Sequence, residues 1–216
     1  MKIVMRRKRP HVESSVPLSA PLTTDQRIQG KFNFQGRRRN LPFYTRRASS
    51  RDGLAALFGE LGFNEGLEVG TYLGEFADLL CTCNPKLHLT CVDPWMAYMG
   101  RTQAREDGFF SIAMKRLKGK NVTIIRKPSQ EGVLDIKDRS LDFVYIDGDH
   151  QFDHAMMDII KWTPKVRSGG IVAVHDYDIS EGADVSSAVN AYTHAHHIDP
   201  WYVTRELTPT AYWVQR

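Results

Sequence analysis

The segment Glu68-Val69-Gly70-Thr71-Tyr72-Leu73-Gly74 decides the fold class of this 216-residue chain. It ends an apolar run that predicts a strand at 66–70, and it leads into a segment at 74–83 whose apolar residues have helical spacing. A strand that passes through a glycine turn into a helix is typical of parallel α/β proteins. The glycines have the spacing GxxxG, which differs from the GxGxxG that cradles a dinucleotide pyrophosphate.

The alternation of strands and helices continues to the end of the chain. Further strands are expected at 87–92, 122–125, 141–146 and 171–175, and further helices at 52–61, 106–117, 152–162 and 185–193. Ser168-Gly169-Gly170 is expected to form a turn, and Thr208-Pro209-Thr210 separates two short segments, 201–205 and 211–214, that fit an antiparallel hairpin. The pattern predicts a Rossmann-like, doubly wound α/β domain at 48–216, with a mostly parallel seven-stranded sheet and a C-terminal hairpin.

Residues 1–47 differ from the remainder in charge. They hold twelve Lys or Arg and two Asp or Glu, a net +10, whereas the whole chain carries +4. Several prolines and the lack of a sustained apolar period predict an extended, flexible arm. Such an arm favours salt-sensitive contact with a polyanion, and an organelle-targeting segment is an alternative for so basic a start.

Polar residues are expected beyond the carboxyl ends of the strands, where open α/β sheets bind ligands. Glu68 places a carboxylate where a ligand ammonium could sit. Asp93 lies about 20 positions past the glycine turn and suits a ribose diol, although it could instead cap the turn before Pro94. Ser129 and Gln130 follow the third strand and suit an adenine edge, although Ser129 could equally begin a helix.

Acidic and histidine residues follow two neighbouring strands. One strand runs into Asp147-Gly148-Asp149-His150 and the next into His175-Asp176-Tyr177-Asp178. Because both ends lie at the same edge of the sheet, we expect these groups to converge on a metal site or an acid/base site. Turn caps and salt links are the structural alternative, disfavoured because buried acidic groups need partners.

These elements together resemble the class I S-adenosylmethionine-dependent methyltransferases, and in particular the catechol and caffeoyl-CoA O-methyltransferases, over residues 50–216. The resemblance implies S-adenosylmethionine as the cofactor. In that family the matching positions contact the methionine part, the ribose and the adenine. They correspond here to Glu68, Gly70, Tyr72 and Gly74, then Asp93, then Ser129 and Gln130.

The same resemblance implies a divalent cation, Mg²⁺ or Mn²⁺, on Asp147, His175 and Asp176, with His150 as the catalytic general base. The reading DGDH is similar to antibiotic-sugar and glycan O-methyltransferases, in which a histidine is that base. His175 departs from the family, which often has aspartate there, and imidazole suits Mn²⁺, Fe²⁺ or Zn²⁺ better than Mg²⁺. Asp149 is therefore an alternative ligand.

The implied activity is methyl transfer to a hydroxyl oxygen of a small molecule, a sugar or a glycan. A nucleic-acid methyltransferase, acting on ribose or base, is the nearest alternative because of the basic arm. However, the strand before Asp147 lacks the D/N-P-P-aromatic motif of enzymes that methylate base amines. A non-catalytic nucleic-acid-binding protein is a second alternative, and an NAD-dependent oxidoreductase is disfavoured because GxGxxG is missing.

The composition is that of a soluble globular protein, and we expect it to be cytoplasmic without a membrane partner. No apolar run reaches the roughly 18–20 residues that span a bilayer. Cys81, Cys83 and Cys91 are odd in number and lack CxxC spacing, which indicates reduced thiols.

Overall fold

The computed structural model describes residues 21–32, 42–44, 49–98, 100–177 and 184–216. Within them the strands, in chain order, are β1 (Phe43–Tyr44), β2 (Glu65–Val69), β3 (His88–Val92), β4 (Val122–Ile125), β5 (Leu141–Ile146), β6 (Val166–Val174), β7 (Trp201–Val203) and β8 (Ala211–Val214). The helices are α1 (Thr24–Lys31), α2 (Arg51–Glu60), α3 (Glu75–Cys83), α4 (Gln103–Arg116), α5 (Ser129–Gly132), α6 (Phe152–Trp162) and α7 (Asp184–Ala195), with short 3-10 turns at Val133–Asp135 and Thr163–Lys165.

The eight described strands form one sheet in the order β1-β7-β8-β6-β5-β2-β3-β4. Every neighbouring pair is parallel except the two that involve β8, which runs antiparallel to both β6 and β7. The Rossmann-like fold with a C-terminal antiparallel hairpin is thereby confirmed. The two-residue strand β1 is the one strand that the sequence did not predict.

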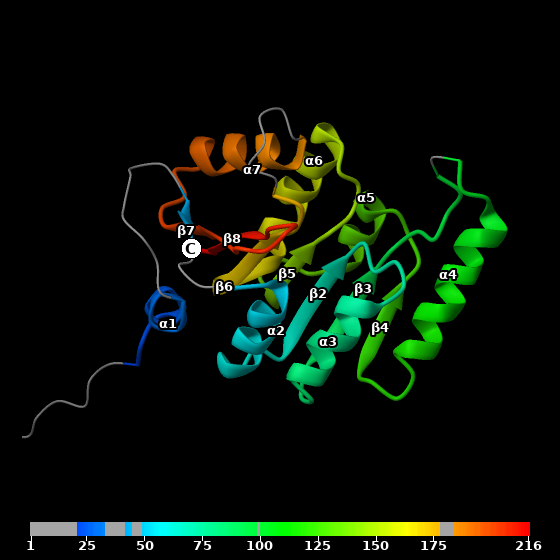
Figure 1. The fold of residues 1–216 in the computed structure, drawn as a ribbon, viewed down its shortest axis with the longest axis horizontal. Coiled ribbons are helices and arrows are strands. Elements are labelled where there is room, and N and C mark those ends of the chain that lie inside the picture. The colour runs from blue at the N-terminus through cyan, green and yellow to red at the C-terminus, as the bar shows by residue number, and fades with distance from the viewer. Residues whose placement is uncertain (1–20, 33–41, 45–48, 99, 178–183) are drawn as a thin grey trace, which may run out of the picture.

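Helices cover both faces of the sheet (Figure 1). One apolar core joins α1, α2 and α3 to the sheet, and it includes Leu57, Phe76 and Tyr145. The other lies beneath α6 and α7, and it includes Ile159 and Val189. Because the central strands β5 and β6 are largely buried between these two cores, their sequences contain long apolar runs, and this is why their positions could be predicted well.

The turn expected at Ser168-Gly169-Gly170 is wrong, because these residues lie inside β6. The pairing of β5 with β6 shifts between Leu141 and Phe143, so additional residues of β6 are accommodated within the strand. A Cβ atom at Gly170 would lie 2.4 Å from the carbonyl oxygen of Asp142. Glycine is therefore required there by the close approach of a neighbouring strand.

Two segments of the expected flexible arm are packed on the domain, which corrects that expectation for residues 21–32 and 42–44. Thr23 and Gln26 form a reciprocal capping box at the start of α1. Ile28 of α1 is fully buried in the core that also holds Leu54 and Leu57 of α2. Phe43 and Tyr44 extend the sheet by pairing with β7. The other residues of the arm lie outside the described ranges.

No helix among the described residues is both long enough and apolar enough to cross a membrane.

Candidate active site

The glycine turn after β2 brings that strand against the end of β5. Gly70 has φ +85°, and a Cβ atom there would lie 1.9 Å from the carbonyl oxygen of Asp147. The Asp147 amide donates a hydrogen bond to the Val69 carbonyl oxygen at 2.8 Å. Gly74, with φ +73°, precedes α3. Only glycine fits this close contact at position 70, which places the predicted cofactor turn beside the predicted metal ligand.

Glu68 is a buried carboxylate next to this turn. Its side chain is 2% exposed, and Oε2 has no hydrogen-bond partner among the described residues. Burial raises the pKa of Glu68 to about 8, and the charges of Asp147 and Asp93 add to this effect. A buried acid without a full set of partners is costly in the free protein, so it is suited to receiving a cationic ligand group.

Asp93 joins the glycine turn to the loop after β3. Its Oδ2 accepts from the Tyr72 amide at 2.8 Å, and its Oδ1 accepts from the Trp95 amide at 2.8 Å. The Trp95 indole in turn donates to the Tyr72 carbonyl oxygen at 2.8 Å. Burial raises the pKa of Asp93. Asp93 therefore does act as a turn-forming residue, and each oxygen keeps a further lone pair for a ligand.

Ser129 and Gln130 begin α5, and both turn towards a residue that sequence reasoning missed. The Ser129 hydroxyl donates to Asp158 Oδ1 at 2.5 Å, and Gln130 Nε2 donates to the same atom at 2.7 Å. The Trp162 indole donates to Ser129 Oγ at 2.7 Å. Asp158 is 3% exposed, and burial raises its pKa to about 6. An acidic residue among the apolar residues of α6 was the available signal.

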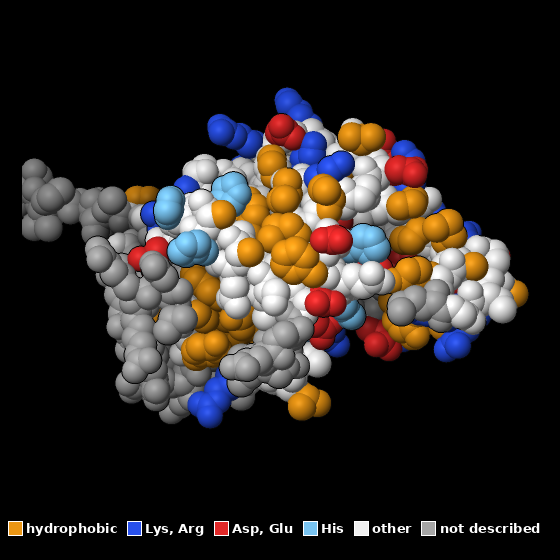
Figure 2. Space-filling model, turned by 90° about the horizontal axis from the view of Figure 1, so that it is seen from above, with side chains coloured by type: hydrophobic (Ala, Val, Ile, Leu, Met, Phe, Trp, Pro, Cys, Tyr) orange, Lys and Arg blue, Asp and Glu red, His pale blue; other side chains and the backbone are white. Residues whose placement is uncertain are grey.

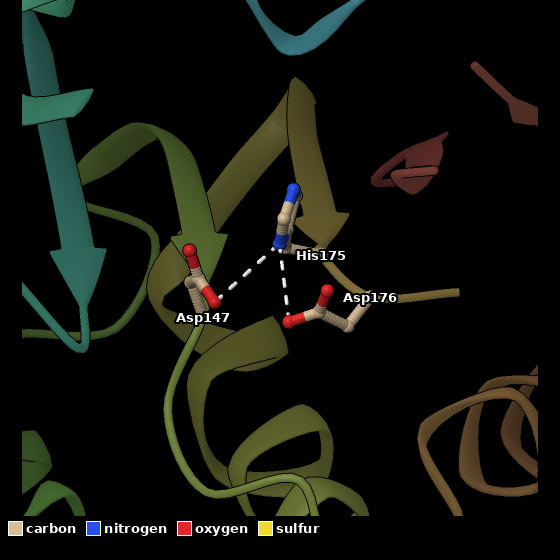
Figure 3. A group of neighbouring side chains, drawn as sticks. All are labelled: Asp147, His175 and Asp176. Carbon is tan, nitrogen blue, oxygen red and sulfur yellow. Dashed lines mark ion pairs between the residues drawn. The ribbon is translucent and has the colours of Figure 1, made fainter. Parts of the chain in front are cut away.

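The ends of β5 and β6 bring the predicted metal ligands together (Figure 3). One ligand atom from each of Asp147, His175 and Asp176 lies within 4.8 Å of the other two. His175 Nδ1 is 3.5 Å from Asp147 Oδ1 and 3.2 Å from Asp176 Oδ2. Figure 3 shows both carboxylates beside the same edge of the imidazole. Asp176 has φ +57°, a left-handed conformation that aspartate tolerates better than most residues.

His150 completes this cluster from the loop before α6. Its Nε2 is 2.8 Å from Asp176 Oδ2 and 3.7 Å from Asp147 Oδ1, and its side chain is 61% exposed. Interaction with Asp147 and then Asp176 raises the pKa of His150 to about 10. The predicted base therefore lies beside the predicted ligands and is open to a substrate.

The charges of the cluster are strongly coupled. Burial would lower the pKa of His175, but Asp147 and Asp176 outweigh it and raise that pKa to about 9. Burial would raise the pKa of Asp147, and the two imidazoles reverse this and lower it. His150 and then His175 hold the pKa of Asp176 far below its usual range. Two carboxylates are thus kept ionised side by side, as a cation site requires.

A divalent cation fits this donor set. His175 Nδ1 and Nε2 are buried without a well-aligned hydrogen bond among the described residues. The ring thus faces two carboxylates without donating cleanly to either, which is the arrangement expected of an imidazole and two carboxylates around an ion. The structure therefore brings the three predicted ligands together, and metal binding itself stays a prediction.

Asp149, the alternative ligand, is directed elsewhere. The Tyr98 hydroxyl donates to Asp149 Oδ2, and His154 Nδ1 lies 3.0 Å from the same oxygen. Gln151 Nε2 donates to the Tyr98 hydroxyl at 3.2 Å. Asp149 therefore ties the loop after β3 to the start of α6. Asp178 lies outside the described residues. Figure 2 shows acidic and histidine side chains close together on the face seen from above.

The sheet order, the glycine turn and the polar residues at the carboxyl edge are the features expected of an α/β methyltransferase. A family model described as a methyltransferase domain matches residues 67–177, just over half of the chain. The chain belongs to this family. The prediction of an S-adenosylmethionine-dependent methyltransferase is confirmed at the level of family and fold.

Several solved structures have a similar fold. Cofactor-bound Rv0187 from MTB has a TM-score of 0.59 and 19% identity, and the match covers 79% of this chain and 83% of that one. The O-methyltransferase TomG from Streptomyces achromogenes, in complex with SAM, has a TM-score of 0.57 and 16% identity over 94% of both chains. SAH-bound PaMTH1 from Podospora anserina has a TM-score of 0.58 and 12% identity, covering 78% and 80%. These likenesses show the fold.

The uncharacterized protein y4gI of Sinorhizobium fredii is 33% identical over 58 residues. The match spans 27% of this chain and 6% of that relative.

Proposed function

We propose that the protein transfers the methyl group of S-adenosylmethionine to a hydroxyl oxygen of a small molecule, a sugar or a glycan, assisted by a divalent cation. The observation that carries this proposal is the convergence of Asp147, His175 and Asp176 with His150. This cluster lies against the glycine turn at Gly70. A methyl donor and an activated oxygen could therefore be held side by side, which in-line transfer requires.

The residues around the glycine turn, which we call the cofactor half of the site, are proposed to bind different parts of S-adenosylmethionine. Glu68 would receive the ammonium of the methionine part, with Gly70, Tyr72 and Gly74 providing the turn. Asp93 would accept hydrogen bonds from the ribose. Ser129 and Gln130 would contact the adenine. TomG and PaMTH1, whose structures hold SAM and SAH, share this fold and support S-adenosylmethionine as the cofactor.

The cluster of Asp147, His150, His175 and Asp176 is proposed to activate the acceptor hydroxyl. Asp147, His175 and Asp176 would hold the cation, which supplies Lewis-acid stabilisation of the acceptor oxygen's negative charge. His150 is proposed to accept the proton of the acceptor hydroxyl, because its imidazole is exposed and adjacent to the carboxylates. Its pKa of about 10 is caused by Asp147 and Asp176, so a cation held by these two carboxylates would lower that pKa and leave the imidazole neutral and able to accept a proton. Tyr98, whose hydroxyl reaches Asp149, would border the acceptor.

The basic residues of the arm support a second proposal about partners. The net charge of +10 over residues 1–47 favours contact with a polyanion or with an acidic acceptor. The three cysteines are free, which supports a reducing, cytoplasmic location.

Calorimetry with S-adenosylhomocysteine, with and without Mn²⁺ or Mg²⁺, tests the binding, and a screen of sugars, glycosides and catechols supplies an acceptor. His150→Ala is expected to bind the cofactor normally and to lower the transfer rate about 10²–10⁴-fold. Asp147→Ala is expected to lose both metal and transfer. His88→Ala is the matched control, since His88 is also ion-paired, with Glu65 at 2.9 Å, but lies at the start of β3. Transfer that resists chelators would contradict the metal role.

A further inference from the structure

Arg51 is a cation at the carboxyl edge of the sheet that the sequence did not single out. It is the first residue of α2, and its amide donates to Glu206 Oε1 at 2.8 Å. Its guanidinium carbon lies 5.6 Å from the centre of the Phe76 ring. Among the described residues, no carboxylate forms an ion pair with this guanidinium, and its charge is placed to receive an anionic group.

The ring beneath Arg51 connects it to the cofactor half of the site. Phe76 lies in the first turn of α3, directly after the glycine turn, and its ring is 4.2 Å from that of Tyr145. Tyr145 is the residue of β5 that pairs with Glu68 of β2, so both side chains extend from the same face of the sheet. Arg51, Phe76 and Glu68 thus lie around one corner of the sheet edge.

The charges agree with this placement. Burial raises the pKa of Glu68, and the Arg51 guanidinium opposes that shift. Burial also raises the pKa of Tyr145, which Arg51 opposes in the same way. Arg51 is therefore close enough to act on Glu68 without forming an ion pair with it. Glu68 meanwhile keeps a buried oxygen without a partner.

We infer that Arg51 binds the α-carboxylate of the cofactor's amino-acid group, opposite Glu68, which receives the α-ammonium. This assignment rests on the proposed binding of S-adenosylmethionine. The amino-acid end of that molecule is a zwitterion, and one cation and one anion on either side of it match both of its charges. Arg51 is half-buried and its guanidinium lies over the Phe76 ring, so the side chain is held in one region before the ligand arrives.

Three ligands separate this role from a structural one. S-adenosylhomocysteine carries the carboxylate and the ammonium, its decarboxylated analogue retains the ammonium, and 5′-methylthioadenosine lacks both. Arg51→Met keeps the aliphatic stem over Phe76 and removes the charge. We expect it to weaken binding of S-adenosylhomocysteine by roughly 10- to 100-fold, as for a charged hydrogen bond, and to leave the other two ligands unchanged. Arg51→Lys is expected to recover part of the loss.

Arg167→Met is the matched control, because Arg167 also lies over a core phenylalanine, at 5.3 Å from the ring of Phe63, but outside the site. It should bind all three ligands as the wild type does. Equal weakening of all three ligands by Arg51→Met, or no weakening of any, would overturn the Arg51 assignment alone. If the wild-type protein binds neither S-adenosylhomocysteine nor 5′-methylthioadenosine, the proposed function itself fails, and the assignment with it.

Discussion

The hydroxyl of Ser129 is held by the carboxylate of Asp158, which accepts its proton in a hydrogen bond of 2.5 Å. The Trp162 indole donates to the same hydroxyl, and Gln130 donates to the same carboxylate oxygen. The two residues proposed to face the adenine are therefore both fixed from behind by α6. Because the Ser129 proton is engaged, this hydroxyl can only accept a further hydrogen bond.

Removing Asp158 should disturb the adenine side of the site from a distance. Asp158→Ala leaves the Ser129 hydroxyl and one Gln130 donor without their buried partner, a cost of about 1–3 kcal/mol in the free energy of unfolding. We expect weaker binding of S-adenosylhomocysteine as well. Urea unfolding and calorimetry measure the two effects. Binding that is unchanged in a destabilised variant would show that Asp158 supports the fold and not the cofactor.

Asp158 should also make stability depend on pH. Burial raises its folded-state pKa to about 6, so the folded protein binds this proton more tightly than the unfolded chain does. The resulting stabilisation is fully present below the unfolded pKa and is lost as the pH rises through about 6. As the pH rises from 4 to 7, the free energy of unfolding of the wild type should fall relative to that of Asp158→Asn by on the order of 2–3 kcal/mol. Urea unfolding of both proteins across this range tests the slope, and parallel curves would refute it.

The sequence could predict the sheet because most of its strands are short apolar runs that alternate with segments of helical spacing. The runs at Val122–Ile125 and Leu141–Ile146 were found with their observed bounds, and the cluster at Asp147, His175 and Asp176 followed from two neighbouring strand ends. Asp158 was missed because its partners, Ser129 and Gln130, are distant in sequence and meet only through packing. Helix α1 was missed because Ile28 is its only buried residue, too weak an apolar pattern to stand out from the basic residues around it.

Glu68→Gln is expected to have opposite effects on stability and binding. The folded-state pKa of Glu68 is about 8, so the folded protein binds this proton more tightly than the unfolded chain does. The resulting stabilisation is fully present below the unfolded pKa and is lost as the pH rises through 8. Glutamine carries no charge at any pH. As the pH rises from 5 to 9, the free energy of unfolding of the variant should therefore increase relative to that of the wild type by on the order of 2–4 kcal/mol. At pH 8 it should nevertheless bind S-adenosylhomocysteine about 10-fold more weakly, because the ligand ammonium loses a carboxylate. Tighter binding by the variant would contradict the role of Glu68.

The N-terminal segment offers the last test, since residues 1–47 supply none of the predicted site residues and we expect cofactor binding to be independent of them. Ile28 is fully buried among core side chains, whereas Leu22, six residues earlier, is 60% exposed. Ile28→Ala should lower the free energy of unfolding by about 2–4 kcal/mol through the lost burial and the cavity left behind, and Leu22→Ala should have little effect. A chain that starts at residue 48 loses both α1 and β1, so it should be less stable than the intact chain. It keeps Glu68, Asp93, Ser129 and Gln130, so we expect it to bind S-adenosylhomocysteine wherever it remains folded. Circular dichroism melting measures the stability of the two variants and of the shortened chain. Calorimetry at low temperature measures binding of S-adenosylhomocysteine by the shortened chain. Loss of binding in the folded, shortened chain would show that residues before 48 form part of the cofactor site.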